Sequence, residues 1–531
     1  MRAVQDTSRK LPLRCGSLPL ATIRQMIGER GRMAGRLSTV TIGQEGRMKQ
    51  LGGIDATFLY METPETPMHV AGLTLYEPPA DLSGSFYDHF KDFFLTRMHL
   101  APIFEKKLAR TVLELDHPAW VDAGEIDISY HLRRSTLAAP GSWKQLEDMV
   151  GELHSTLLDR SRPLWQFTVI DGLDDGNVAI YSKMHHAAID GGAGMAIAAA
   201  LYDMSPQPRK VKPPEPKPAV RKPTIEERAI LGINDVVQNV MRQQLKAMEA
   251  VPQVLGTLTD LLIAKSGNGE NKGVGLPGIP DILAPKTPFN VTITAQRSFA
   301  ARALSLGDAK MIAKATGTKI NDVVMAVSAG ALRAYLEDHE ALPKKPLVAF
   351  VPISLRQPGD MDASNQVFGM FCPIATELAD PLERLMAIRK NSGDSKTLAG
   401  TVKDVSPKDY TLLGAPILFP GLAQLYGRTG LADVMPSTTN LTISNVPGPP
   451  IPVFCAGAKV LAMFPVSIPI HGIALNITVQ SYQDRLDFGI TADRRAVPDI
   501  DHLGDLLVTA MAELKAAAEK LPAPPPKPTK Q

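Results

Sequence analysis

The chain has 531 residues, of which 44% are hydrophobic and 21% are charged, and its formal net charge is +2. This length allows roughly two to four domains of ~100–200 residues each, and the small net charge gives no indication of a nucleic-acid-binding protein. The three cysteines, Cys15, Cys372 and Cys455, are far apart in the sequence. They predict neither a disulfide framework nor a cysteine zinc site, and they fit a reducing compartment.

Residues 1–47 differ in character from the rest of the chain. Basic residues outnumber acidic ones there, and no continuous apolar run of signal-peptide length occurs. We expect a disordered basic extension, and an upstream start codon would account for it. An arginine-rich arm that contacts a membrane surface is the alternative.

Strand-like and helical patterns alternate after this extension. The periodicity predicts strands at 70–76 and 178–184, and helices at 85–97, 143–158 and 193–204. Residues 48–204 are therefore expected to form the N-terminal half of the protein.

A change of composition marks the next segment, residues 205–289. Its first part, 205–223, is rich in Pro and Lys, which is typical of an extended linker. Apolar residues at helical spacing then predict amphipathic helices at 224–251 and 253–264. We expect these helices to pack on the main body, with docking on a lipid surface as the alternative.

Residues 290–520 are expected to form the C-terminal half, followed by a disordered tail at 521–531. The patterns predict helices at 308–316, 322–338 and 499–520, and strands at 347–351, 441–443, 473–479 and 486–491. Two comparable halves of mixed strands and helices indicate an α/β (α+β) fold with a site at their junction.

Two long uncharged stretches, 410–427 and 460–482, raise the question of a membrane span. Each contains prolines, and the second also contains His471 and Asn476, so neither reads as the ~20 predominantly apolar residues that a spanning helix needs. We interpret the first stretch as an apolar helix or lid and the second as consecutive buried strands.

The clearest functional signal is His185-His186-Ala-Ala-Ile-Asp190-Gly191, placed where a predicted strand gives way to a glycine turn. A histidine at such a position can direct its ring into a cleft and act as a general base. A metal pair or a core histidine is the alternative. Adjacent histidines on an extended strand face opposite sides, however, and no further ligands have suitable spacing, so no metal is predicted. A serine nucleophile elbow is also missing.

Several motifs together resemble the bacterial wax ester synthase/acyl-CoA:diacylglycerol acyltransferase family. The similar segments are 51–62 with 67–70, Pro163-Leu164-Trp165, 185–191, Asn321-Asp322 and 444–449, in the order that the family has them. The histidine motif alone is less specific, because chloramphenicol acetyltransferases, condensation domains and plant acyltransferases share it.

The resemblance implies two chloramphenicol acetyltransferase-like domains with mixed sheets and an active-site tunnel at their interface. Acyl-CoA would enter one mouth as co-substrate, with no cofactor and no metal, and diacylglycerol or a long-chain alcohol would enter the other. By the same resemblance His186 is the base, Asp190 holds the loop and His185 packs behind the site. No acyl-enzyme is expected, because no suitably partnered Ser or Cys is evident.

The substrate-binding candidates are Gly191, Trp165, Asn321, Ser444 and Asn445. Asn321, Ser444 and Asn445 are also candidate donors to the oxyanion, and the sequence does not choose among them. Each has a structural alternative. Asn321 would cap the following helix, Ser444 would lie in a rigid turn at 444–450, and Trp165 would be a core or tunnel-wall residue.

The expected location is cytoplasmic, with peripheral attachment to the inner membrane or to lipid inclusions. Two other functions stay open: the same base with another hydroxylated lipid or polyketide acceptor, and a non-catalytic lipid-inclusion protein. Acceptor preference, acyl chain length and oligomeric state are not fixed by the sequence.

Overall fold

The computed structural model describes residues 49–109, 117–189, 191–215, 283–354, 367–403 and 415–522. The predicted extension at 1–47, the predicted helices at 224–251 and 253–264 and nearly all of the predicted tail lie outside the described residues. The chain from Lys49 onward forms one compact unit.

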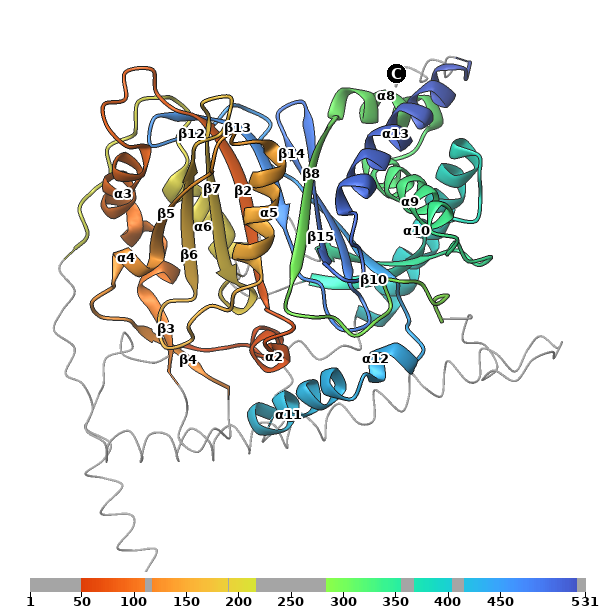
Figure 1. The fold of residues 1–531 in the computed structure, drawn as a ribbon, viewed down its shortest axis with the longest axis horizontal. Helices are drawn as coiled ribbons and strands as arrows, with labels where there is room; N and C mark the ends of the chain where they lie inside the picture. Colours follow the sequence, from red (N-terminus) through yellow and green to blue (C-terminus); the bar gives the residue numbers. More distant parts are fainter. Residues whose placement is uncertain are drawn as a thin grey trace, which may run out of the picture. The chain divides into compact units, whose positions relative to one another are not determined.

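Two six-stranded sheets form the framework of this unit (Figure 1), and both are mixed, as the family resemblance implied. The first has the order β12-β13-β2-β7-β6-β5, in which the neighbours β5 and β6 are parallel and the others antiparallel. Its strands are β2 (His69–Glu77), β5 (Leu132–Thr136), β6 (Trp165–Asp171), β7 (Val178–His185), β12 (Phe454–Cys455) and β13 (Ala458–Val466).

The second sheet has the order β10-β9-β11-β14-β15-β8, with β11 parallel to both of its neighbours. Its strands are β8 (Arg297–Ser305), β9 (Val348–Ser354), β10 (Val367–Pro373), β11 (Leu441–Val446), β14 (Leu475–Tyr482) and β15 (Arg485–Asp493). A small third sheet contains β1 (Lys49–Gln50), β3 (Lys106–Ala109) and β4 (Ala119–Asp122). A tunnel between the two large sheets stays a prediction.

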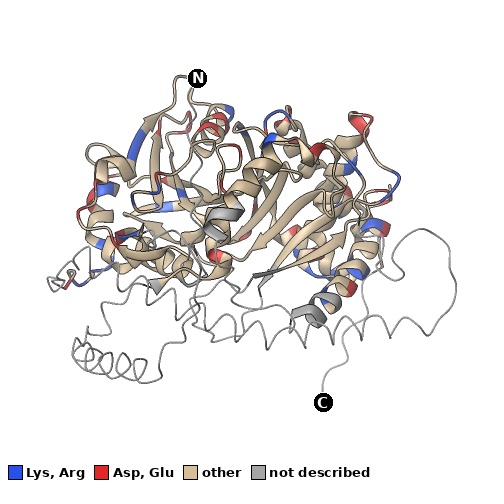
Figure 2. Cartoon of the chain, turned by 90° about the horizontal axis from the view of Figure 1, so that it is seen from below, with Lys and Arg blue, Asp and Glu red and all other residues tan. Residues whose placement is uncertain are grey.

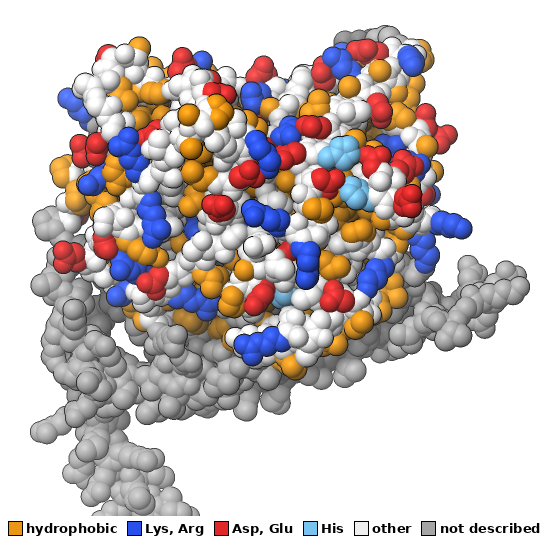
Figure 3. All heavy atoms as spheres, viewed as in Figure 1, with side chains coloured by type: hydrophobic (Ala, Val, Ile, Leu, Met, Phe, Trp, Pro, Cys, Tyr) orange, Lys and Arg blue, Asp and Glu red, His pale blue; other side chains and the backbone are white. Residues whose placement is uncertain are grey.

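The helices and 3₁₀ turns connect and cover these sheets. They are α2 (Gly53–Met61), α3 (Phe86–Arg97), η2 (Met98–Leu100), η3 (Pro102–Glu105), α4 (Ile128–His131), α5 (Trp143–His154), η5 (His186–Ala188), α6 (Gly191–Leu201), α8 (Leu306–Thr316), α9 (Ile320–Asp338), α10 (Pro381–Lys403), α11 (Ala415–Arg428), α12 (Leu431–Val434) and α13 (Ile500–Glu519). Charged residues lie mainly on helices and loops (Figure 2), and acidic and basic side chains are interspersed on the face in Figure 3.

The C-terminal half contributes two strands to the first sheet, which the sequence analysis did not predict. Strands β12 and β13 come from the predicted C-terminal half, yet they extend the first sheet beside β2, with Val466 opposite Ala71. A division at residue 290 therefore does not separate the two sheets. The physical reason is apolar burial, because Phe464 and Val466 of β13 complete a core cluster that includes Leu73 of β2.

Helix α5 lies between the two sheets (Figure 1) and belongs to the same cluster. It begins with a capping box, in which Ser142 and Gln145 satisfy each other's backbone N–H groups. Its apolar residues Leu146 and Val150 pack with Phe299 of β8 and with strands of the first sheet. Burial of this stripe joins the two sheets.

An aromatic core packs on the face of the first sheet that is opposite to α5. Trp165 is 0% exposed, its indole N–H donates to the carbonyl oxygen of Phe104 at 3.0 Å, and its ring stacks on His131 at 4.4 Å. Phe94 and Phe167 pack against the same indole ring. Trp165 is therefore a core residue, which is one of its two structural alternatives; the other was a residue of the tunnel wall.

The second half has a larger core around α9, in which 13 of the 19 helix residues are buried. This helix begins earlier than predicted. Lys319 is its N-cap, and Asp322 accepts a hydrogen bond from the backbone N–H of Lys319 at 3.0 Å. Asn321 is therefore inside the first turn, and the alternative in which it caps the helix is wrong.

The two uncharged stretches have the predicted elements. The first contains α11, which has Pro420 inside it, and the second contains β13 and β14. Among the described residues, none of the helices combines the length and apolarity needed to cross a bilayer.

Replacement of Trp165 tests its place in the core. Trp165→Ala removes the indole from a closely packed aromatic cluster, so we expect the free energy of unfolding to fall by about 3–5 kcal/mol. Urea unfolding followed by circular dichroism measures this change. Trp165→Phe, which keeps an aromatic ring there, is the control and should be less destabilising. A loss below ~1 kcal/mol for Trp165→Ala would contradict the core assignment.

Candidate active site

The histidine pair lies where β7 ends. His185 is the last residue of β7 and is paired with His69 of β2. The next backbone N–H, that of His186, donates to the carbonyl oxygen of Met68 at 2.8 Å. The segment that precedes β2 is therefore bonded to His186, the first residue after β7, where η5 begins.

Alternation along β7 decides which way each ring faces. Ile180 and Met184 lie in the aromatic core, whereas Ala179 and Tyr181 lie in the cluster with α5. Residues two apart share a face of a strand, so His185 continues the face of Tyr181. His186 follows in the 3₁₀ turn and faces α2 instead, as its contact with Phe58 shows.

His185 is fixed from both sides of its ring. It is 0% exposed, and its Nδ1 accepts a hydrogen bond from the backbone N–H of Ala187 at 3.1 Å. In the neutral ring the proton is therefore on Nε2, which lies 3.1 Å from Oε2 of Glu62. This geometry agrees with the predicted place of His185 behind the site.

Glu62 is a site residue whose role the sequence reasoning missed, although it ends the similar segment at 51–62. Its carboxylate lies 2.7 Å from a guanidinium nitrogen of Arg160 and accepts the backbone N–H of Met68 at 3.2 Å. Burial raises the pKa of Glu62, but the neighbouring N–H of His185 and the guanidinium of Arg160 outweigh it and lower the pKa overall. An ionised Glu62 thus holds together the histidine loop and the segment before β2.

His186 is partly exposed, and its ring stacks on Phe58 of α2 with 3.8 Å between centroids. Its Nδ1 is buried and has no hydrogen-bond partner within the described part of the chain. Burial lowers the pKa of His186 to about 4; its own backbone carbonyl acts in the opposite direction, and His185 adds to the lowering. The ring is therefore neutral at physiological pH, which is the form that can accept a proton.

The other predicted site residues are distributed over the fold. Asp190 lies outside the described residues. Gly191 begins α6 directly after the histidine loop. Trp165 lies opposite Met184 on the neighbouring strand, inside the aromatic core.

The three candidate oxyanion donors belong to the second half. Asn321 lies in the first turn of α9, while Ser444 and Asn445 lie in β11, opposite Thr478 and Val479 of β14. The turn predicted at 444–450 is thus a strand for its first three residues. All three donors are partly exposed.

A buried polar chain lies on the face of His185. His69 donates from Nε2 to the carbonyl oxygen of His154, and His154 donates from Nε2 to that of Ser467, each at 2.8 Å. The hydroxyl of Tyr181 donates to Nδ1 of His154, also at 2.8 Å. Burial lowers the pKa of His154 to about 3 and that of His69 well below its ordinary value. These bonds connect β2, α5 and the segment after β13.

Arg297 connects the second sheet to the same region. Its guanidinium is 1% exposed and donates to the carbonyl oxygens of Glu65 and Thr294, while its backbone N–H donates to Ser155. The segment between α2 and β2, which contains Glu62 and Met68, is thereby bonded to both halves.

Two domain models of one known protein family match most of the sequence. Residues 51–324 match the wax ester synthase/diacylglycerol acyltransferase catalytic domain, and residues 363–515 match the C-terminal domain of the same family. The chain belongs to the wax ester synthase/diacylglycerol acyltransferase family.

Individual relatives agree with this membership. A Mycobacterium tuberculosis protein named as a diacylglycerol O-acyltransferase is 38% identical over 464 residues, which cover 87% of this chain and 99% of that protein. The O-acyltransferase WSD of Acinetobacter baylyi is 34% identical over 86% of this chain and 94% of its own. The solved structure of the wax ester synthase/diacylglycerol acyltransferase from Marinobacter aquaeolei VT8 has a TM-score of 0.63 and 29% identity, over 89% of this chain and all of that one.

The buried histidines predict how stability changes with pH. The folded pKa values of His69 and His154 are lowered below 6.5, so the unfolded chain binds more protons as the pH falls below that value. Stability is therefore complete above about pH 6.5 and decreases by about 1.4 kcal/mol per pH unit for each such histidine in the acid range. Urea unfolding at pH 7.5 and 5.5 measures the decrease.

The control variant is His154→Gln, which can still donate to Ser467 but does not titrate. We expect its stability to depend less on pH than that of the wild type. An identical pH dependence in the two proteins would contradict the neutral, buried state of His154.

Proposed function

We propose that this protein is an acyl-CoA-dependent O-acyltransferase that transfers a long-chain acyl group to diacylglycerol, to a long-chain alcohol, or to both. The products would be triacylglycerol and wax ester. The observation that carries the proposal is His186, a neutral and partly exposed imidazole at the end of β7, held against Phe58 and backed by the His185–Glu62 pair. A relative named as a diacylglycerol O-acyltransferase and a solved structure named as a wax ester synthase/diacylglycerol acyltransferase support the choice of substrates.

The chemistry follows from the properties of the two reactants. An alcohol oxygen is a weak nucleophile, so His186 removes its proton as the oxygen attacks the thioester carbonyl carbon. A tetrahedral oxyanion forms; when the carbon–sulfur bond breaks, the imidazolium gives the proton to the departing sulfur. The ester and free CoA thiol leave, and the ring returns to its neutral form. This role requires the tautomer with the proton on Nδ1, in which Nε2 carries the lone pair.

The remaining residues have supporting roles in this proposal. Glu62 keeps His185 in one tautomer, so the backbone N–H of Ala187 stays bonded to the His185 ring and the loop keeps its shape. Asn321, Ser444 and Asn445 remain the candidate donors to the oxyanion, a contact typically worth ~2.7–4 kcal/mol.

Replacement of His186 tests the base. His186→Ala should lower CoA-thiol release from palmitoyl-CoA by about 10²–10⁴-fold with dioleoylglycerol or hexadecanol as acceptor. His502→Ala, in which an exposed histidine of α13 is lost, is the control and should behave like the wild type.

The possible results of this experiment distinguish the proposed function from the two alternative functions. Equal release by wild type and His186→Ala would refute the base. Release with only another hydroxylated lipid or a polyketide acceptor would keep the mechanism and change the substrate. A folded wild type that releases no CoA with any alcohol would favour a non-catalytic lipid-inclusion protein.

We also propose that the protein attaches peripherally to the cytoplasmic face of the inner membrane or to lipid inclusions through α11 and α12. Among the described side chains, Leu422, Leu425, Leu431 and Val434 are large, apolar and 36–76% exposed, and we call them the α11–α12 surface. Arg428 is the one charged residue in the sequence of α11. Exposed apolar residues grouped on a helix with so little charge are typical of lipid-binding helices.

The introduction of negative charge on this surface tests the attachment. We expect Leu422→Glu/Leu425→Glu to lower co-flotation with phosphatidylcholine vesicles containing dioleoylglycerol by about tenfold, because two carboxylates would have to leave water. Val508→Glu changes a comparably exposed apolar residue on α13 and should float like the wild type. Equal flotation of all three proteins would show that the protein uses another surface.

A further inference from the structure

Arg160 is a partly exposed residue in the loop between α5 and β6, and its guanidinium contacts two parts of the candidate active site. Its Nε donates to Oε1 of Glu62 at 2.8 Å, and its Nη2 lies 2.7 Å from the same oxygen. Nη2 also donates to the carbonyl oxygen of Leu59, in the last turn of α2, at 2.7 Å. The planar guanidinium holds its acceptors in a fixed geometry, so it joins the C-terminal end of α2 to the Glu62 carboxylate.

The loop presents Arg160 in a fixed position. Oδ1 of Asp159 accepts the backbone N–H of Ser161 at 2.8 Å and its hydroxyl at 2.7 Å, which closes a turn around Arg160. The Arg160 side chain is 39% exposed, whereas the Glu62 side chain is 3% exposed. The carboxylate is thus inside the protein, and the guanidinium lies between it and the solvent.

The second oxygen of Glu62 faces the histidine loop. Oε2 lies 3.1 Å from Nε2 of His185 and accepts the backbone N–H of Met68 at 3.2 Å. The carbonyl oxygen of Met68 in turn accepts the backbone N–H of His186 at 2.8 Å. The two oxygens of one carboxylate therefore connect Arg160 with both histidines of the motif.

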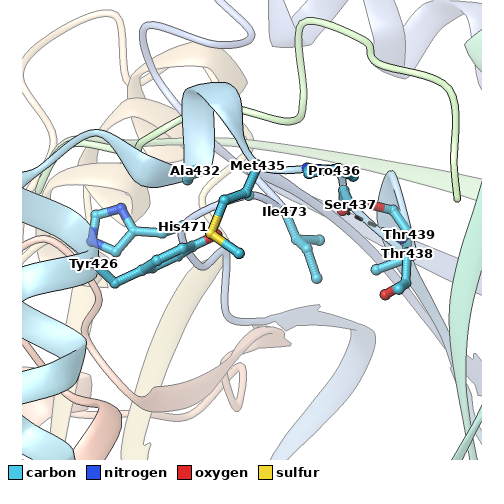
Figure 4. A pocket seen from close by; sticks show the side chains of 10 residues that line it. Tyr426, Ala432, Met435, Pro436, Ser437, Thr438, Thr439, His471 and Ile473 are labelled. Carbon is cyan, nitrogen blue, oxygen red and sulfur yellow. Dashed lines mark hydrogen bonds between the residues drawn. The ribbon is translucent and has the colours of Figure 1, made fainter.

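Helix α2 provides the other connection. Leu59 follows Phe58, the residue whose ring stacks on His186. Helix α2 also packs against α11, but a pocket of about 210 Å³, with Tyr426 of α11 in its lining, adjoins α11 and α12 (Figure 4). A helix beside a cavity is less closely packed than one in a dense core. The bond from Arg160 therefore gives α2, and with it Phe58, a directional support that packing on α11 does not supply.

The charge of Arg160 also keeps Glu62 ionised. Burial raises the pKa of Glu62, and the neighbouring His185 and Arg160 lower it. Lys183, on the same face of β7 as His185, is a further cation near this carboxylate, and burial lowers the pKa of Lys183 to about 7. A neutral carboxyl group is a weaker acceptor than a carboxylate, so protonation of Glu62 would weaken its contacts with the histidine loop.

We propose that Arg160 is a positioning residue for the acyl transfer. Through Glu62 and α2 it holds the loop and the helix that place His186, and by its positive charge it preserves this arrangement as the pH falls. This inference rests on the proposed function. Arg160 acts through Glu62 and α2 and not on a substrate, so its loss should slow the reaction without weakening substrate binding.

Removal of the guanidinium gives the first test. Arg160→Met should lower kcat with palmitoyl-CoA and dioleoylglycerol about tenfold at pH 7.5 and leave both KM values within about twofold of the wild type, because a displaced base reacts slowly with a normally bound substrate.

The control for this test is Arg134→Met. Nε and Nη2 of Arg134, which is 50% exposed, lie 2.9 and 2.8 Å from one oxygen of Asp171, at the end of β6 that is remote from the motif. This variant loses a similar ion pair and should keep the wild-type constants. An unchanged kcat in Arg160→Met, or an equal loss in Arg134→Met, would overturn the proposal.

The pH dependence of kcat tests the role of the charge. The arrangement needs an ionised Glu62, so activity is lost as the pH falls through the pKa of Glu62. Arg160→Met leaves Glu62 buried but removes a cation that lowers its pKa, so this loss moves to higher pH. We expect the ratio of kcat at pH 7.5 to kcat at pH 5.5 to rise about threefold in Arg160→Met and to return toward the wild-type ratio in Arg160→Lys, which keeps the charge. Equal ratios in the three proteins would refute this role.

A measurement without turnover tests the histidine loop directly. Nitrogen-15 NMR of histidine-labelled protein, with His185→Gln for assignment, reports which ring nitrogen of His185 carries the proton. We expect the Nε2–H form in the wild type at pH 7.5 and a mixture of both tautomers in Arg160→Met. Thermal unfolding checks that each variant folds.

The two proposals fail in different ways. Wild-type protein in which the His185 tautomer depends on Arg160, but which transfers no acyl group, would refute the proposed function and keep the link between Arg160 and the loop. Wild-type protein that transfers acyl groups, with kcat, its pH ratio and the tautomer all unaffected by Arg160→Met, would refute the link and keep the function.

Discussion

The hydrogen bond from the backbone N–H of His186 to the carbonyl oxygen of Met68 extends the β2–β7 register by one residue, and the candidate site depends on it. Side chains alternate along a strand, so a slip of one residue would exchange the places of the two histidines. In the observed register His185 reaches Glu62 in the interior, and His186 reaches Phe58 at a partly exposed position. The pairing of two strands therefore decides which imidazole can meet a substrate.

The region between the two sheets contains buried polar contacts beside its apolar cluster. A buried polar group is costly unless it is bonded, and here each main contact joins one half to the other. His154 of α5 donates to Ser467, Arg297 of β8 donates to Glu65, and Glu147 of α5 lies 2.9 Å from Arg302 of β8. Burial raises the pKa of Glu147 to about 7 despite the nearby guanidinium. Unlike apolar packing, such directional contacts fix the relative position of the halves around His186.

The local signals of the sequence were sufficient for several of the elements and for the position of the motif. Helix α3 begins after Ser85 and β7 ends at His185, as the periodicity predicted. Pairing between distant segments left no local signal. The addition of β13 to the first sheet, the carboxylate of Glu62 beside His185 and the Lys319 cap of α9 each depend on contacts that only the folded chain creates. The family resemblance supplied His186 as the base, whereas the reason it faces outward came from the register.

A pKa of about 4 makes His186 a weak base, and this sets a condition on the rest of the site. In the proposed mechanism, burial disfavours the imidazolium that forms during attack, since a charge in a dry site lacks the stabilisation of water. The tetrahedral oxyanion carries the opposite charge and forms at the same moment. At short range in a medium of low dielectric constant, the two charges stabilise each other far more than they would in water. The burial that weakens the base in the free protein therefore favours the charge pair of the transition state, provided that the lipid substrates exclude water from the site.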